Sequence, residues 1–156
     1  MFKTNKNIRG VLMIEQDTIK LLRECDAGIK MGVDSINDVL DDVKNEDFKS
    51  LLKECRDKHE KLGDELRELL KDYHDDGKDP NPAAKSMSWL KTFAKLAADK
   101  SDKTIADLMT DGCNMGVKSI NRYLNQYAAA DEKSKKIAER LSSLEEELCV
   151  SIRKYL

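Results

Sequence analysis

Apolar residues recur at helical spacing along most of the chain. In the first half they follow a period of three to four residues over 17–40 and again over 51–73. This spacing places the apolar side chains on one face of an amphipathic helix. The polar stretch 41–47 between the two helices is short, and a short connection makes neighbouring helices antiparallel. We therefore predict a helical hairpin, with Asp17 as the N-cap of its first helix.

The second half of the chain repeats this pattern. One apolar stripe covers 105–127 and another covers 137–152, with Asp131 in position to cap the last helix. Between the halves, the segment 74–82 contains a glycine and two prolines, which must end the preceding helix. A short helix that carries Trp89 is expected to follow. The second half is thus predicted to be another antiparallel hairpin.

The two predicted hairpins share a sequence motif. MGVDSINDVL at 31–40 recurs as MGVKSINRYL at 115–124, with seven of the ten positions identical. Gly28 and Gly112 extend the match at the same separation of 84 residues. The second helices of the hairpins also correspond, at a separation of 82 residues. We interpret the chain as an internal duplication of a whole hairpin.

This organisation predicts an all-α protein. Two antiparallel hairpins joined by a long crossover form a four-helix bundle of the ferritin-like type. The expected parts are an N-terminal arm without a sustained period at 1–16, a hairpin at 17–73, a crossover with a short extra helix at 74–101, and a hairpin at 102–156. The last three parts make a single domain over 17–156.

Composition and charge narrow the classes of partner. Charged residues make up 37% and the net charge is −2, with lysines interleaved among acidic residues, so no nucleic-acid partner is expected. The apolar run 11–14 is too short for a signal peptide or a membrane span. These features favour a soluble cytoplasmic protein without a membrane partner. The four cysteines lie far apart and form no C-x-x-C pair, which predicts reduced and mostly buried thiols.

The order of these parts resembles a family of small bacterial proteins of unknown function in the ferritin-like superfamily. The resemblance covers about residues 17–156 and rests on Asp17-Thr18-Ile19, Trp89 in the crossover, the polar break before Thr104-Ile105, and Asp111-Gly112. None of these is a catalytic motif. The resemblance implies the bundle fold and little chemistry, because that family has no established activity.

A di-iron centre is not predicted. Di-iron proteins of this fold use a Glu-x-x-His motif on two helices, but the residues three before His59 and His74 are Arg56 and Lys71. The acidic residues of the last helix are interpreted as its solvent-exposed face; they are Glu139, Glu145, Glu146 and Glu147. Descent from a former di-iron protein remains open.

A metal site of another kind is the alternative. Cys55 and His59 lie one helical turn apart on a core-facing stripe, and Cys113 falls at a similar depth on the third helix. Thiolate and imidazole are ligands of zinc and copper. The simpler reading is a buried neutral His59 that donates to a carbonyl or carboxylate, for which Asp26 is a candidate. No cofactor is expected on that reading, and zinc, copper or iron on the other.

The glycines of the repeated motif need a separate explanation, since glycine inside a helix costs about 1 kcal/mol relative to alanine. Small and flexible residues share one side of the first and third helices: Gly28, Met31, Gly32 and Ser35, and Gly112, Met115, Gly116 and Ser119. The first reading is a close crossing of these two helices. The second is a shallow groove open to a second subunit or an apolar ligand. Asn37 and Asn121, at matching places, are expected to hydrogen-bond across the resulting interface.

Taken together, the residues favour a non-enzymatic structural or protein-interaction module, with a homo-oligomer or a protein partner. No glycine-rich phosphate loop and no grouping of a nucleophile with a base is recognisable. Metal handling through Cys55, His59 and Cys113 is the alternative function.

Overall fold

A computed structural model describes residues 2–81 and 98–156 of the chain. Within these residues the protein contains four α-helices, one short 3-10 helix and no β-strand. The elements are α1 (Phe2–Leu40), α2 (Glu46–Lys71), α4 (Asp102–Gln126), α5 (Glu132–Ser151) and η1 (Arg153–Tyr155). The expected helix at Trp89 lies outside the described residues. The prediction of an all-α bundle is confirmed.

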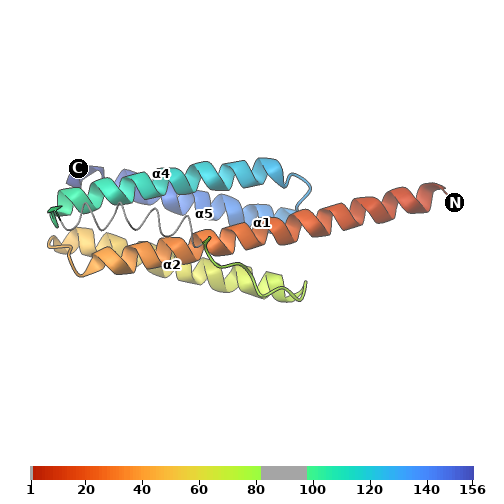
Figure 1. The fold of residues 1–156 in the computed structure, drawn as a ribbon, viewed down its shortest axis with the longest axis horizontal. Helices are drawn as coiled ribbons and strands as arrows, with labels where there is room; N and C mark the ends of the chain where they lie inside the picture. The colour runs from red at the N-terminus through yellow and green to blue at the C-terminus, as the bar shows by residue number, and fades with distance from the viewer. Residues whose placement is uncertain (1, 82–97) are drawn as a thin grey trace.

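The four long helices lie side by side in one bundle (Figure 1). α1 packs against α2 and α4 packs against α5, and α1 also contacts α5 across the bundle. Asp102, the first residue of α4, accepts hydrogen bonds from the backbone N–H groups of Lys44 and Asn45 at 2.8 Å each. Since α2 runs from that end to the opposite end, α4 must begin where α2 began, and the two helices are parallel.

Polar caps define most helix starts. Asn45 accepts a hydrogen bond from the Phe48 N–H, Ser101 accepts one from the Thr104 N–H, and Asp131 caps α5 as predicted. Asp17, by contrast, is not an N-cap, because α1 begins 15 residues earlier, at Phe2. Its carboxylate instead accepts a hydrogen bond from the Ala129 N–H at 3.0 Å, between the ends of α4 and α5.

Residues 2–16 therefore form a regular helix, where the sequence predicted an arm that is irregular or partly helical. Figure 1 shows this part of α1 projecting beyond the ends of the other three helices. A rise of 1.5 Å per residue makes the projection about 22 Å long. The absence of a sustained apolar period over 1–16 thus did not indicate the absence of a helix, since no other helix in the described part of the chain packs along this projection.

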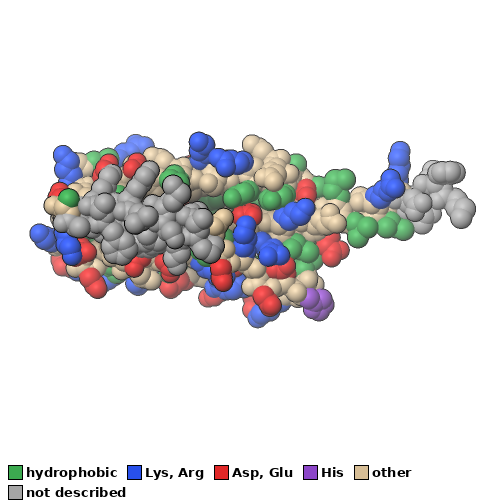
Figure 2. Space-filling view, viewed as in Figure 1, with side chains coloured by type: hydrophobic (Ala, Val, Ile, Leu, Met, Phe, Trp, Pro, Cys, Tyr) green, Lys and Arg blue, Asp and Glu red, His purple; other side chains and the backbone are tan. Residues whose placement is uncertain are grey.

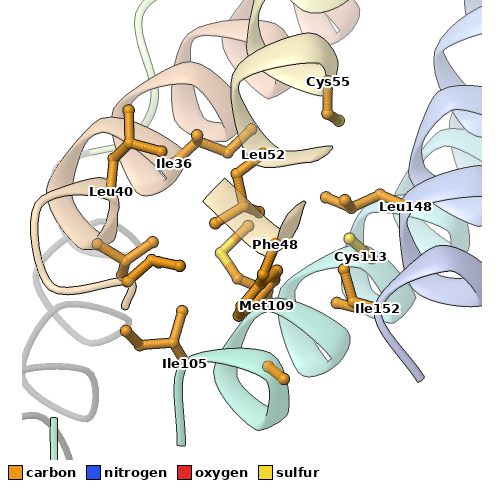
Figure 3. Packing of buried hydrophobic residues seen from close by; sticks show 13 residues of the cluster. Ile36, Leu40, Phe48, Leu52, Cys55, Ile105, Met109, Cys113, Leu148 and Ile152 are labelled. Atoms are coloured by element: carbon orange, nitrogen blue, oxygen red, sulfur yellow. The ribbon is translucent and has the colours of Figure 1, made fainter. Parts of the chain in front are cut away.

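The apolar core is divided into two clusters along the bundle. One fills the end near the α1–α2 loop and includes Phe48 (Figure 3). Phe48 is fully buried and stacks on Tyr155. The other fills the end near the α4–α5 loop, around Leu22 and Leu66. Each of the four helices contributes to both clusters. The four residues that lie near the boundary between the clusters are Gly32, His59, Gly116 and Glu145.

Candidate functional site

A buried pair of ionisable side chains separates the two apolar clusters. His59 comes from α2 and Glu145 from α5, and their side chains meet with His59 Nε2 at 2.9 Å from Glu145 Oε1. The residues are 1% and 8% exposed. Both sit on the core stripe of an amphipathic helix, where the bundle excludes water from their contact. The prediction that His59 is buried and hydrogen-bonded is confirmed.

The sequence-based reading of Glu145 was wrong. Its side chain does not join the solvent-exposed face of α5 but points into the core as the partner of His59. A signal was present: Glu145 lies four residues after Leu141 and three before Leu148, both buried, so it falls on the apolar stripe. Asp26, the other candidate partner of His59, is engaged elsewhere.

Both ring nitrogens of His59 face oxygen acceptors. Nδ1 lies 2.8 Å from the carbonyl oxygen of Cys55, one turn earlier in α2, and Nε2 faces the Glu145 carboxylate. Two acceptors satisfy a ring with two N–H groups, which is the imidazolium form. Burial disfavours this charge, but hydrogen bonds with the side chains of Cys55 and Glu145, together with the negative charge of the Glu145 carboxylate, raise the pKa of His59 to about 10. The two acceptors and the raised pKa both favour the imidazolium form of His59 at neutral pH over the neutral ring that the sequence suggested.

The repeated glycines make room for this pair. A methyl group on Gly32 would lie 3.2 Å from His59 Cδ2 and 3.3 Å from Nε2. A methyl group on Gly116 would lie 3.3 Å from both Cγ and Cδ of Glu145. Each helix thus contributes one residue to the layer, with a charged side chain from α2 and from α5 and a glycine from α1 and from α4.

The expected close crossing of the first and third helices is not what these glycines provide. The atoms nearest to the added methyl groups come from side chains of α2 and α5, and a methyl group on Gly112 would meet nothing within 4 Å. Gly28 and Gly112 are exposed, as is Met115, whereas Met31, Ser35 and Ser119 are half-buried. Among the four glycines of the repeated motif, Gly32 and Gly116 are the two at which an added methyl group would contact His59 or Glu145.

The two asparagines of the motif do bridge helices, within each hairpin. Asn37 accepts a hydrogen bond from Arg56 Nη1 across α1 and α2 at 3.1 Å. Asn121 donates from Nδ2 to Ser142 Oγ across α4 and α5 at 3.2 Å. These bonds join the two helices of each hairpin, whereas the sequence predicted hydrogen bonds across the interface of the small-residue strip.

Three of the four cysteines are buried. Cys55 Sγ lies 3.5 Å from His59 Nδ1, and Cys113 lies in the same apolar cluster. Burial, with the negative charge of Glu145 and a hydrogen bond to it, raises the pKa of Cys113. Burial and the neighbouring carboxylates Glu24 and Asp26 raise the pKa of Cys25 to about 12. Such thiols stay protonated at neutral pH and are poor nucleophiles.

The predicted metal ligands thus approach one another without forming a coordination site. Cys55, His59 and Cys113 surround one level of the core, but within residues 2–81 and 98–156 no three ligand side chains are placed to hold one ion. Both His59 nitrogens already have partners. A metal ion at Nε2 would have to displace the hydrogen bond to Glu145.

Asp26 is a second buried carboxylate, and it anchors the start of the crossover. Its oxygens accept hydrogen bonds from the Lys78 N–H at 3.0 Å and Arg67 Nη1 at 3.3 Å, and Lys30 Nζ is 2.8 Å away. Gly77 has a φ of +87°, and a methyl group there would lie 2.3 Å from the carboxylate. A groove of about 600 Å³ lies beside this cluster, and its cations, Lys30 and Arg67, are already bound to Asp26.

The projecting part of α1 is the most apolar exposed region among the described side chains. Its exposed apolar residues are Ile8, Val11, Leu12, Met13 and Ile14, with exposed fractions of 46% to 63%. Figure 2 shows green apolar and blue basic side chains along this projection. No helix in the described part of the chain is long and apolar enough to cross a membrane.

Comparison with known proteins adds no relative. No family model matches the chain, and neither the curated proteins nor the solved structures yield a match.

Proposed function

We propose that this protein is a ferritin-like bundle, formed by duplication of a hairpin, that serves as a non-enzymatic structural or protein-interaction module. Two parallels support the duplication. Gly32 and Gly116, at equivalent places in the repeat, each leave room for one member of the buried pair. Asn37 and Asn121 each bridge the two helices of their own hairpin.

The observation that carries the interaction role is the exposed apolar surface of the α1 projection. Large apolar side chains on a protein surface mark binding sites when they are contiguous. Burying the remaining surface of each half-exposed side chain would contribute about 1 kcal/mol. Val11 and Ile14 together with Ile8 and Leu12 offer enough such surface on one helix to support binding by a helix-in-groove or helix-pairing mode.

The buried polar groups support a non-catalytic interior. His59 and Glu145 satisfy each other inside the core, and the raised pKa values of Cys25 and Cys113 keep these thiols protonated. A catalytic base or nucleophile needs access to a substrate and a pKa suited to proton transfer. The buried ion pair and the protonated thiols therefore fit a structural role better than a catalytic one.

The test compares two variants of the full chain. Val11→Asp with Ile14→Asp places two charges on the projection, where neither side chain supports the bundle. Val150→Asp places a charge at an apolar residue of α5 that is 56% exposed. Recovery of partners from extracts, including other copies of this chain, should fall at least about tenfold for the first variant only. Equal recovery with both variants would remove the assigned role from the projection.

Metal handling is the second candidate, favoured by the convergence of Cys55, His59 and Cys113 on one level of the core. Metal binding there would require release of the His59–Glu145 hydrogen bond. Elemental analysis of protein purified without a chelator tests this function. Stoichiometric zinc, copper or iron that disappears in His59→Leu would support it, whereas no stoichiometric metal in the native chain would exclude it as a resident site.

A further inference from the structure

The bundle has a defined end where the α1 projection leaves it. Thr18 is fully buried, and its hydroxyl accepts a hydrogen bond from the Asp131 N–H at 2.9 Å. Asp17 accepts one from the Ala129 N–H. Tyr73, just after α2, donates to Asp131 Oδ2 at 3.3 Å. The loop before α5 therefore bonds to α1 at Asp17 and Thr18 and to the end of α2 through Tyr73, and residues 2–16 continue beyond this level.

Two apolar residues extend the core-facing side of α1 beyond that level, although residues 2–16 have no sustained apolar period. Val11 and Ile14 precede Thr18 by seven and four residues, so they lie on the same face of the helix. Thr18 is covered by the other helices, whereas Val11 is 63% and Ile14 is 46% exposed. Along the projection, the face that forms the interhelical interface in the bundle continues without a covering helix among the described residues.

The tip of the projection is basic, whereas a group of carboxylates lies at the bundle end, where the exposed lysines Lys20 and Lys133 are also present. Lys6 and Arg9 are exposed near the tip, which is also the N-terminus of a helix and carries its partial positive charge. Asp72 and Asp76 are exposed where α2 ends, and Glu15 lies at the base of the projection. The charges of Asp131, Glu15 and Asp72 all act on Tyr73, which places these carboxylates around one side chain.

We propose that the α1 projection pairs with the same segment of a second copy of this chain, in an antiparallel and two-fold symmetric arrangement. A two-fold interface requires a self-complementary surface. Because both projections have the same length, antiparallel pairing brings each basic tip to the acidic bundle end of the other copy. The two apolar stripes then cover each other between the bundles. This dimer rests on the proposed interaction role and identifies a second copy of the chain as the partner.

Two other arrangements fit the charges less well. Parallel pairing would place Lys6 and Arg9 of both copies together and leave the acidic ends without a partner. An anionic membrane would attract the basic tip but repel Asp72 and Asp76 at the nearby bundle end. Only an antiparallel second copy satisfies both charged regions at once.

The first experiment is sedimentation equilibrium of the full chain over roughly 1 to 200 µM. An interface of one helical face per copy is small, so a dimer with a dissociation constant on the order of micromolar is expected. Val11→Asp with Ile14→Asp should weaken it by more than about 100-fold, because each dimer would then hold four carboxylates in an apolar interface. Val150→Asp should change the constant less than about threefold. A native chain that is monomeric at every concentration overturns the proposal.

The second experiment reverses the charges. One variant carries Lys6→Glu with Arg9→Glu and has an acidic tip facing an acidic end. The other carries Asp72→Lys with Asp76→Lys and has a basic tip facing a basic end. Each alone should dimerise at least about tenfold more weakly, and an equimolar mixture should recover the native affinity as a heterodimer. A mixture no tighter than its components refutes antiparallel pairing.

These outcomes separate the dimer from the broader interaction role. If the chain is monomeric but its projection still binds another protein, and Val11→Asp/Ile14→Asp abolishes this binding, the dimer is refuted and the proposed function stands. A projection that binds neither a second copy nor a protein sinks both. Sedimentation with vesicles of anionic phospholipid, abolished by the same double substitution in a monomeric chain, would assign the projection to a membrane surface instead.

Discussion

The buried pair of His59 and Glu145 should behave as one unit when it is removed. His59→Leu leaves a carboxylate in the core, and Glu145→Met leaves an imidazolium there, each without its counter-charge. The double variant leaves an apolar layer of similar volume. We expect each single substitution to be far more damaging than the two together.

The magnitude follows from burial. His59 is 1% and Glu145 is 8% exposed, so neither remaining charge can recover its hydration without opening the bundle. Breaking a buried ion pair on one side typically costs about 3–5 kcal/mol, whereas replacing both members by apolar groups is often neutral or stabilising. We expect about 3–4 kcal/mol for each single variant and no more than about 2 kcal/mol for the double variant.

Urea unfolding followed by circular dichroism at pH 7 measures these free energies of unfolding. The dependence on urea concentration should be the same in all four proteins, which shows that the same surface is exposed. Glu145→Gln serves as a milder control, since its amide oxygen can still accept from His59 Nε2, and it should cost about 2 kcal/mol.

Additive effects would refute the reasoning. If the double variant lost the sum of the two single losses, the pair would stabilise the core directly and the cost would not come from an uncompensated charge. The layer would then have to be treated as two independent polar contacts.

Three further outcomes are expected. The pKa of His59 is about 10 in the folded state and 6.5 in the unfolded state, so its contribution to stability is fully present below pH 6.5 and is lost as pH rises towards 10. Urea unfolding from pH 6.5 to 8.5 should show that the free energy of unfolding decreases by up to about 1.4 kcal/mol per pH unit. A variant without the pair should not show this decrease. Gly32→Ala should destabilise the protein, because His59 is held at both nitrogens and cannot move aside, whereas Gly112→Ala should stabilise it by about 1 kcal/mol; equal thermal shifts for both would contradict this. Gly77→Ala should cost about 2 kcal/mol or more through its positive φ and its collision with Asp26, and unchanged thermal unfolding would show that the contact yields.

The helices and the antiparallel course within each half followed from local patterns in the sequence. Apolar spacing located α2, α4 and α5 to within a few residues, and the Asp131 cap was recognisable because a cap uses residues close in sequence. The start of α1 was missed because its prediction relied on apolar spacing alone. Periodicity reports packing against neighbours, and residues 2–16 have no neighbours among the described helices.

Only part of the candidate site could be predicted from the sequence. Burial of His59 could be inferred from its position on an apolar stripe, and Cys55 and Cys113 were placed correctly near its level. Its partner could not be inferred, because Glu145 is distant in sequence and sits among glutamates that do face solvent. Asp26 was misassigned because its partners Lys78 and Arg67 are distant in sequence, in the crossover and in α2, and no local pattern specifies these contacts.

The sequence by itself determined where helices form, which faces are apolar and which residues repeat, since these depend on neighbours within a turn or two. The tertiary structure alone decided what the repeated glycines do. They look alike along the chain, but Gly32 and Gly116 meet the buried charges while Gly112 meets nothing within 4 Å. The difference arises from α2 and α5, whose side chains reach these positions only when four helices come together.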